Sequence, residues 1–203
     1  MKIIGITGGV GAGKSTVLNY LKGTYGACVL QADQVGHLLM RPGESCYGPM
    51  VELFGREILR EDGTIDRKKV GGIVFSNDRL LKKLNNIIHP QVKKYIFQEI
   101  SRQKEAGTEL FVLEAALLLE DEYDAICDEV WYIYADEETR KRRLMASRGY
   151  SEEKIQGIFD SQMSSSDFFT YCDRAVDNCN SFQEACGEID DVMAQLGIEK
   201  IHK

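Results

Sequence analysis

Short, strongly apolar segments alternate along this chain with longer stretches in which apolar residues recur at the spacing of a helix. Apolar segments without polar alternation are typical of strands that are buried on both faces of a parallel sheet. Because helical stretches lie between them, we predict an α/β fold with a five-stranded parallel sheet flanked by helices. The predicted strands are Lys2–Thr7, 27–31, Leu110–Glu114, Glu129–Tyr134 and 174–176.

Two intervening stretches are too long for one helix that connects neighbouring strands. Residues 34–107 contain glycine or proline breaks, and because these residues interrupt helices, we predict an inserted helical lobe. Residues 136–171 are polar and helical, with Ser151 as an expected N-cap, and we interpret them as a lid. Residues 1–33, 108–135 and 172–203 then form the core of a single domain. The breaks in the lobe fall at Pro42-Gly43, Gly55, Gly63 and His89-Pro90.

The first predicted strand is followed by a segment that matches the pattern G-x-x-x-x-G-K-[ST]. Glycines let successive backbone N–H groups converge on phosphate oxygens, and the next helix adds the positive end of its dipole. In this pattern Lys14 reaches the β- and γ-phosphates and the Ser15 hydroxyl coordinates Mg²⁺. We therefore predict a P-loop NTPase fold; the alternative is a glycine-rich turn, which would match by chance in about one such chain in a hundred. The segment comprises Gly8, Gly9, Val10, Gly11, Ala12, Gly13, Lys14 and Ser15, followed by Thr16.

Two acidic residues lie at the ends of predicted strands, where a parallel sheet presents side chains to a ligand. Asp33 could accept a proton from a hydroxyl that attacks the γ-phosphate, or it could cap a helix that begins at Gln34. Glu114 could hold a water molecule on Mg²⁺, or it could be a polar strand end. The residues alone leave both pairs of alternatives open.

A basic run, Arg140-Lys141-Arg142-Arg143, lies in the predicted lid with Arg148 beyond it. Such a run is most often a solvated helix face. Arginines on a closing lid also stabilise the charge that spreads over the phosphate oxygens during phosphoryl transfer. In the context of a P-loop, we expect Arg143 or Arg148 to act in this way.

Composition and charge limit the partners. The 203-residue chain has a net charge of −7, and binding to nucleic acid or to an anionic membrane needs a basic surface. No apolar run approaches the ~18–20 residues of a membrane span. Six cysteines occur without a CxxC pair. We expect a cytoplasmic protein with reduced thiols, no nucleic-acid or membrane partner, and a monomeric or weakly homo-oligomeric state.

Several residue combinations outside the P-loop occur at characteristic separations. They are Ala32-Asp33, Ile65-Asp66-Arg67-Lys68, Ile88-His89-Pro90, Gln162 and Asp177-Asn178. With them, the sequence resembles the bacterial dephospho-CoA kinase family over nearly its full length. The resemblance implies a P-loop kinase that uses ATP and Mg²⁺ to phosphorylate the ribose 3′-hydroxyl of dephospho-CoA, which yields CoA and ADP.

The resemblance also implies roles for individual residues. Asp33 is expected as the general base and an acceptor contact, Lys14 as the phosphate clamp and Arg143 as the lid arginine. Arg67 and His89 would contact the acceptor, although His89 could equally be a packed residue that fixes a helix break before Pro90. The residues expected near the adenine are Asp177 and Asn178.

The sequence departs from the family pattern at three places. Gln31 stands where the family often has an aspartate, and a basic residue that usually follows Gln162 is replaced near Phe168. The family's P-L-L-F-E segment keeps its acidic residue but lacks the proline, and it reads Ala116-Leu117-Leu118-Leu119-Glu120. Two other functions also remain open: a kinase for another small metabolite, and a nucleotide-dependent switch. The motifs of the helical lobe argue against the first, and the absence of an N-K-x-D motif argues against a guanine-nucleotide switch.

Overall fold

The computed structural model describes residues 1–75 and 77–201. The chain forms two compact units. The core unit combines Met1–Leu30 with Gln103–Lys203, and the helical unit is Gln31–Arg102. The sequence predicts an insertion at 34–107; the helical unit instead begins at the last residue of the second strand and ends inside a long helix.

The described residues contain five strands and two kinds of helix. The strands are β1 (Lys2–Thr7), β2 (Cys28–Gln31), β3 (Leu110–Glu114), β4 (Glu129–Tyr134) and β5 (Arg174–Asp177). The α-helices are α1 (Lys14–Tyr25), α2 (Ala32–Leu39), α3 (Tyr47–Phe54), α4 (Arg67–Val74), α5 (Asp78–Glu105), α6 (Glu137–Arg148), α7 (Glu152–Asp160), α8 (Ser165–Tyr171) and α9 (Phe182–Gln195). Two 3₁₀ helices, η1 (Arg56–Ile58) and η2 (Asp124–Ile126), complete the described elements.

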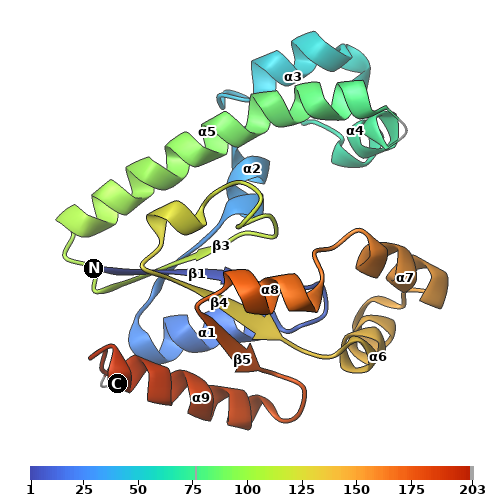
Figure 1. Ribbon diagram of the computed structural model, residues 1–203. Helices are drawn as coiled ribbons and strands as arrows, with labels where there is room; N and C mark the ends of the chain where they lie inside the picture. The colour runs from blue at the N-terminus through green and yellow to red at the C-terminus, as the bar shows by residue number, and fades with distance from the viewer. Residues whose placement is uncertain (76, 202–203) are drawn as a thin grey trace. The chain divides into compact units, whose positions relative to one another are not determined.

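The five strands form one parallel sheet in the order β2-β3-β1-β4-β5 (Figure 1). The strand β1 lies at the centre, where Ile6 pairs with Glu114 of β3 on one side and with Trp131 of β4 on the other. The predicted fold class is therefore confirmed. Two strand ends differ by one residue from the prediction, since β2 begins at Cys28 and β5 continues to Asp177.

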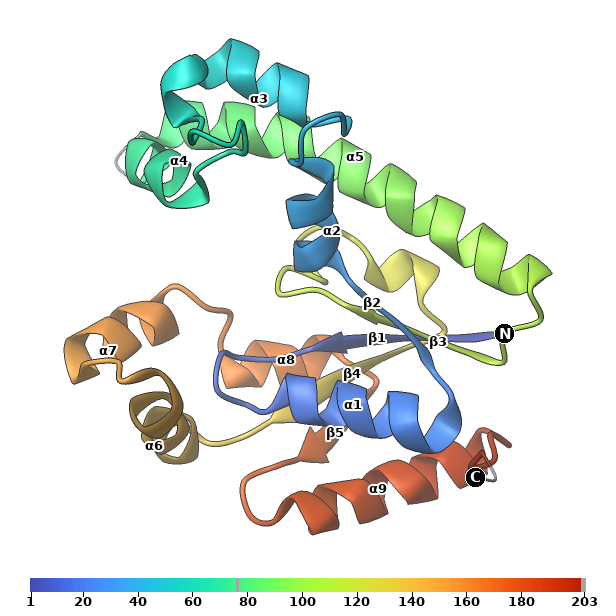
Figure 2. The ribbon, with the colours of Figure 1, turned by 180° about the vertical axis from the view of Figure 1, so that it is seen from behind.

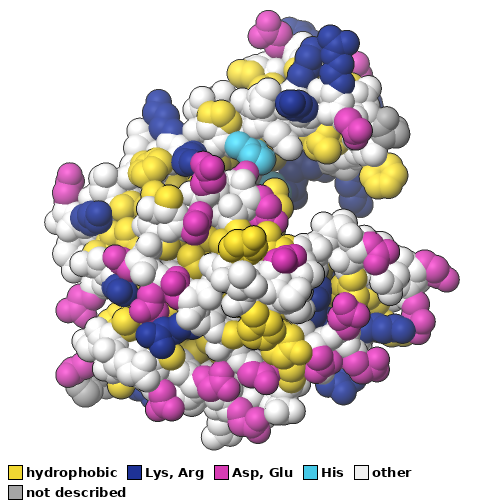
Figure 3. All heavy atoms as spheres, viewed as in Figure 1, with side chains coloured by type: hydrophobic (Ala, Val, Ile, Leu, Met, Phe, Trp, Pro, Cys, Tyr) yellow, Lys and Arg dark blue, Asp and Glu magenta, His cyan; other side chains and the backbone are white. Residues whose placement is uncertain are grey.

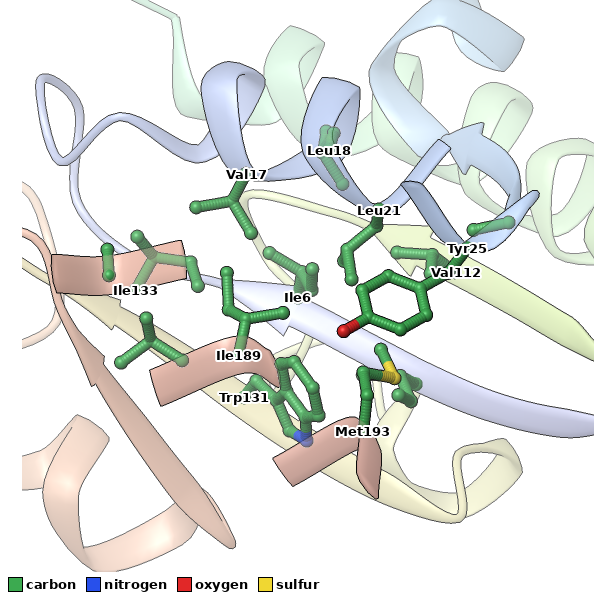
Figure 4. Close-up of a cluster of buried hydrophobic side chains, with 14 of the residues drawn as sticks. Ile6, Val17, Leu18, Leu21, Tyr25, Val112, Trp131, Ile133, Ile189 and Met193 are labelled. Atoms are coloured by element: carbon green, nitrogen blue, oxygen red, sulfur yellow. The ribbon is translucent and has the colours of Figure 1, made fainter. Parts of the chain in front are cut away.

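Both faces of the sheet are covered by helices of the core unit. Figures 1 and 2 show α1 and α9 on one face and α8 on the other. On the first face, Figure 4 shows side chains from both helices converging on β1 and β4. Trp131 of β4 is fully buried in this cluster. On the other face Phe168 of α8 stacks on Tyr132, with ring centroids 4.7 Å apart. Since neighbouring residues of a strand point to opposite faces, β4 contributes to both layers.

The prediction of a helix break at His89-Pro90 is wrong. The helix α5 runs without interruption for 28 residues with Pro90 inside it. Proline removes one backbone hydrogen bond, to the carbonyl group four residues earlier. Both Pro90 and Asn86, which carries that carbonyl group, are exposed, so water can satisfy it. Burial of Val92, Ile96 and Ile100 on one face stabilises the helix beyond the proline.

The surface carries charges of both signs. Figure 3 shows acidic and basic side chains interspersed over the face in view, and hydrophobic side chains that gather near α8. Among the exposed hydrophobic residues of α8 are Phe169 and Tyr171. None of the helices in residues 1–75 and 77–201 is long and apolar enough to cross a membrane.

Candidate functional site

The glycine-rich segment forms a tight loop between β1 and α1. Gly8 has a φ of 141° and Gly13 a φ of 94°, which are backbone conformations that other residues rarely adopt. A Cβ atom on Gly8 would lie 2.5 Å from the carbonyl oxygen of Ile133, and one on Gly13 would collide with the side-chain nitrogen of Asn178. Space and backbone angle therefore both require glycine at these two positions.

The first turn of α1 is available to an anion. The N-cap residue Gly13 has no side chain, so it makes no side-chain capping hydrogen bond to the start of the helix. The backbone carbonyl of Gly13 accepts hydrogen bonds from the N–H groups of Thr16 at 3.0 Å and of Val17 at 3.3 Å. Uncapped N–H groups and the positive end of the helix dipole together favour a bound phosphate.

Lys14 lies folded over this loop. Its Nζ donates to the carbonyl oxygen of Gly8 at 2.7 Å and lies 3.8 Å from Oε1 of Glu114. Glu114 is buried, 7% exposed, and it ends β3 beside β1. The structure therefore brings together, at the carboxyl edge of the sheet, a lysine from the start of α1 and a carboxylate from the end of β3, which lie 100 positions apart in the sequence.

Two side chains support the loop from other elements. Nδ2 of Asn178, which follows β5, donates to the carbonyl oxygen of Ala12 at 2.7 Å, and Arg143 of α6 donates to the same oxygen at 3.4 Å. Asn178 is buried, and its Oδ1 has no partner among the described residues. Asp177 instead accepts a hydrogen bond from the backbone of Cys179 at 2.8 Å. The expected adenine contacts of Asp177 and Asn178 stay predictions, while support of the loop by Asn178 was not predicted.

Asp33 lies in the first turn of α2 and is exposed. The helix begins at Ala32, one residue before Asp33, and the N-cap position is taken by Gln31. The alternative in which Asp33 caps a helix that starts at Gln34 is therefore wrong. Its carboxylate remains accessible two residues beyond the end of β2.

The basic run on α6 does not form a uniform solvated face. Lys141 pairs with Glu152 at 3.0 Å and Arg142 is exposed. Arg143 contacts the phosphate loop, whereas Arg148 lies exposed at the end of α6, 5.8 Å from the ring centroid of Tyr150. Arg140 is buried. The burial of Arg140 was not predicted, although its spacing of four residues from the apolar Leu144 places both on one face of the helix.

The helical unit contains an apolar cavity of about 210 Å³ with two basic side chains in its lining. Arg67, at the start of α4, and His37 of α2 are these basic residues, and His89 is not among the lining residues. Partial loss of hydration, which is the larger cause, and the charge of Arg67 lower the pKa of His37, although the residue as a whole is exposed. The other lining residues are Met40, Met50, Ile65, Val70, Gly71, Leu84 and Ile88.

Local capping places Arg67 in the lining of this cavity. The side chain of Asp66 caps α4 and accepts hydrogen bonds from the backbone of Lys68 at 3.0 Å and of Lys69 at 3.2 Å. Arg67 is consequently the first residue of the helix. Within the Ile65-Asp66-Arg67-Lys68 segment, Ile65 and Arg67 line the cavity while Asp66 fixes the helix start. The position of His37 in this lining was not predicted, because its spacing from Arg67 along the chain carries no signal.

A parallel sheet with a glycine-rich loop, a helix start and a lysine at the end of its central strand defines a P-loop nucleotide-binding protein, and the structure belongs to the class of P-loop kinases. The model of the dephospho-CoA kinase family matches residues 2–184. The chain therefore belongs to the dephospho-CoA kinase family.

One curated relative agrees with this assignment, and two solved structures share the fold. The dephospho-CoA kinase of Aquifex aeolicus is 38% identical over 196 residues, which cover 97% of this chain and 98% of that protein. A crystal structure of a Thermus thermophilus protein matches with a TM-score of 0.83 and 30% identity over 96% of this chain and 97% of the other. The dephospho-CoA kinase of Campylobacter jejuni shares the fold, with a TM-score of 0.70 and 24% identity over 96% of this chain and 99% of that chain.

Proposed function

We propose that this protein transfers the γ-phosphoryl group of ATP to the ribose 3′-hydroxyl of dephospho-CoA and so produces CoA and ADP. The observation that carries the proposal is the phosphate loop, in which backbone N–H groups, an uncapped helix start and Lys14 converge in a member of this family. The six cysteines of the chain include no CxxC pair, which is compatible with a reducing cytoplasm, where we place the reaction. A monomeric or weakly homo-oligomeric state stays a prediction.

The residues near Lys14 suit Mg²⁺. This cation prefers oxygen ligands, keeps several of its waters and is usually bound through one or two protein groups and the substrate phosphates. Ser15 in the first turn of α1 is exposed and offers a hydroxyl, and Glu114 offers a carboxylate that could hold a metal-bound water. The hydroxyl of Thr7, just before the loop, is buried without a partner among the described residues, so it can still accept a water. When bound, Mg²⁺ would neutralise charge on the β- and γ-phosphates.

We assign the role of general base to Asp33. In open parallel sheets, ligands bind beyond the carboxyl ends of the strands, and Asp33 follows the end of β2. The carboxylate of Asp33 does not cap the helix and is exposed. It can therefore accept the proton of the 3′-hydroxyl while that oxygen attacks phosphorus. Lys14 and Arg143 would stabilise the charge on the transferred group.

The cavity of the helical unit is our proposed contact for the acceptor. Its volume of about 210 Å³ lies below the ~300–1,000 Å³ of pockets that enclose a whole small molecule. It would therefore hold one apolar portion of dephospho-CoA. Arg67 can form a forked pair of hydrogen bonds with a diphosphate, and His37 can add a charge-assisted one.

A mass-spectrometric assay tests this proposal directly. Incubation of the purified protein with ATP, Mg²⁺ and dephospho-CoA should yield CoA and ADP in equal amounts, and omission of the acceptor should reduce ADP to the background of slow hydrolysis. Parallel incubations with adenosine, shikimate and gluconate would show whether the acceptor is selected. Production of ADP without any phosphorylated acceptor would contradict the proposal.

A further inference from the structure

A buried arginine without a counter-ion lies against the phosphate loop. Arg140 of α6 is only 7% exposed. Its Nε donates to the carbonyl oxygen of Val10 at 2.9 Å, a terminal nitrogen donates to Oε1 of Gln162, and the guanidinium carbon lies 4.2 Å from the ring centroid of Phe159. All these partners are neutral. Over residues 1–75 and 77–201, no carboxylate oxygen lies within 4.0 Å of its nitrogens.

The contacts of Arg140 fix the peptide groups of Val10. Oε1 of Gln162 accepts the N–H of Val10 at 3.3 Å, in addition to the bond from Arg140. The N–H and the carbonyl group of one loop residue are thus both held by the helical segment that follows β4. Gly9 shows how close the arginine lies, since a Cβ atom there would collide with the guanidinium carbon. The φ of Gly9 is not positive, so a side chain at this position would be opposed by the contact with Arg140 and not by the backbone conformation.

The position of Arg140 is costly for the free protein. A buried charge that has only neutral partners keeps much of its desolvation penalty. Burial accordingly lowers the pKa of Arg140, and the charge of Glu137, which lies beyond ion-pair distance, offsets this effect only in part. A polyphosphate chain bound in the loop would supply several negative charges beside it, and in a site with little water such an interaction is far less screened than at the surface.

We propose that Arg140 is a positioning residue for the nucleotide, whose phosphate chain serves as its missing counter-ion. The arginine acts through the loop, because it holds the Val10 peptide in place, and through its buried charge, which favours anions in the neighbouring cradle. This inference rests on the proposed use of ATP. It predicts a combination that a purely structural role does not produce: removal of the charge weakens nucleotide binding without destabilising the free protein.

The test compares Arg140→Met with Arg142→Met. Methionine fills a similar volume without charge, and Arg142 is an exposed neighbour on the same helix, so the control removes the same formal charge. Titration calorimetry with ATP and Mg²⁺ should show a Kd about 10-fold higher for Arg140→Met, which corresponds to about 1.4 kcal/mol, and within two-fold of wild type for Arg142→Met. Inorganic tripolyphosphate should lose affinity by the same factor, because the effect acts on phosphates. Arg140→Lys, which keeps the charge, should recover part of the ATP affinity.

The melting temperature of the nucleotide-free protein provides the second readout. Replacement of a buried, unpaired charge by an apolar side chain is expected to leave it unchanged or to raise it. A melting temperature several degrees lower in Arg140→Met would show that Arg140 stabilises the fold, and it would overturn the inference. An ATP affinity within two-fold of wild type would overturn it as well. Binding is measured without acceptor, so the two proposals fail separately. If the wild-type protein binds ATP but does not phosphorylate dephospho-CoA, only the proposed reaction is contradicted.

Discussion

The phosphate loop and the cavity of the helical unit are built in opposite ways. The loop uses backbone N–H groups and one lysine from a single continuous segment, and its glycines are fixed by φ angles and close contacts. The cavity is lined by residues from α2, α3, α4 and α5, together with Met40 after α2 and Ile65 before α4. A change in the loop therefore alters groups that any triphosphate needs. A change in the cavity alters the shape and charge that one acceptor needs.

This difference predicts that substitutions in the two regions separate kinetically. Variants of the loop should affect every reaction of the nucleotide, whereas variants of the cavity should raise the KM of the acceptor alone. Asp33 provides an intermediate case, since a general base affects the chemical step and leaves the binding of ATP unchanged.

The largest effect is expected for Lys14→Ala. Loss of the ammonium group removes charge stabilisation at the β- and γ-phosphates, so kcat/KM should fall about 10³-fold or more, with weaker ATP binding. Steady-state kinetics and calorimetry with ATP measure both quantities. Lys22→Ala, at the exposed end of the same helix, serves as the control and should stay within two-fold. Equal losses in the two variants would point to damage of α1 rather than to loss of a phosphate contact.

Asp33→Asn should have the next largest effect. The amide cannot accept the proton of the 3′-hydroxyl, so kcat should fall about 10²-fold or more while the Kd of ATP stays within two-fold. Asp78→Asn is a matched control, because Asp78 also lies in the first turn of a helix of the same unit and loses the same dipole interaction. A kcat close to that of wild type in Asp33→Asn would remove Asp33 from the mechanism.

Arg67→Met should affect the acceptor alone. Loss of a forked, charge-assisted contact to a diphosphate costs about 2 kcal/mol, which raises the KM of dephospho-CoA about 30-fold and leaves the KM of ATP unchanged. Initial rates at varied concentrations of each substrate measure the two constants. Arg56→Met removes an exposed arginine of the same unit that does not line the cavity, and it should behave as wild type. An equal rise in both KM values in Arg67→Met would contradict the separation of the two regions.

The smallest expected effect is the uptake of protons when the acceptor binds. Because the pKa of His37 lies below its ordinary value of 6.5, the imidazole is mostly neutral near pH 6.5 in the free protein. An anionic acceptor in the cavity would raise that pKa again, so binding should take up a fraction of a proton at about this pH. Calorimetry of dephospho-CoA in buffers of different ionisation enthalpy measures this uptake. It should disappear in His37→Gln; uptake that persists there would assign the proton to another group.

The lowered pKa of His37 also determines the direction in which the stability of the free protein changes with pH. A histidine whose pKa is lowered in the folded state favours the neutral form there. Its contribution to the free energy of unfolding is therefore present above pH 6.5 and is lost as the pH falls through the folded-state pKa. It is lost because the unfolded chain binds more protons in this pH range. In His37→Gln this part of the pH dependence of stability should vanish. The comparison needs only thermal melts between pH 5 and pH 8, without any ligand.

The sequence predicted the fold class, the strand positions to within a residue and the phosphate loop, because each depends on local patterns. It was wrong about Pro90, since the packing of Val92, Ile96 and Ile100 outweighs the loss of one hydrogen bond. It left open whether Asp33 caps α2, and only the observed helix start at Ala32 excluded that role. The pairing of Lys14 with Glu114 followed from the strand order, which local patterns do not give.

What the sequence determined by itself is the identity of the phosphate-binding machinery, because a glycine-rich turn between a strand and a helix is a short-range structure whose backbone geometry requires those residue types. Only the tertiary structure decided which basic residues meet which partners. Arg140 is buried against Val10 while Arg142, two residues later, is exposed, and His37 joins Arg67 in the lining of one cavity. These contacts join residues about 30 to 130 positions apart, and burial, which sets their electrostatic strength, exists only after the helices have packed.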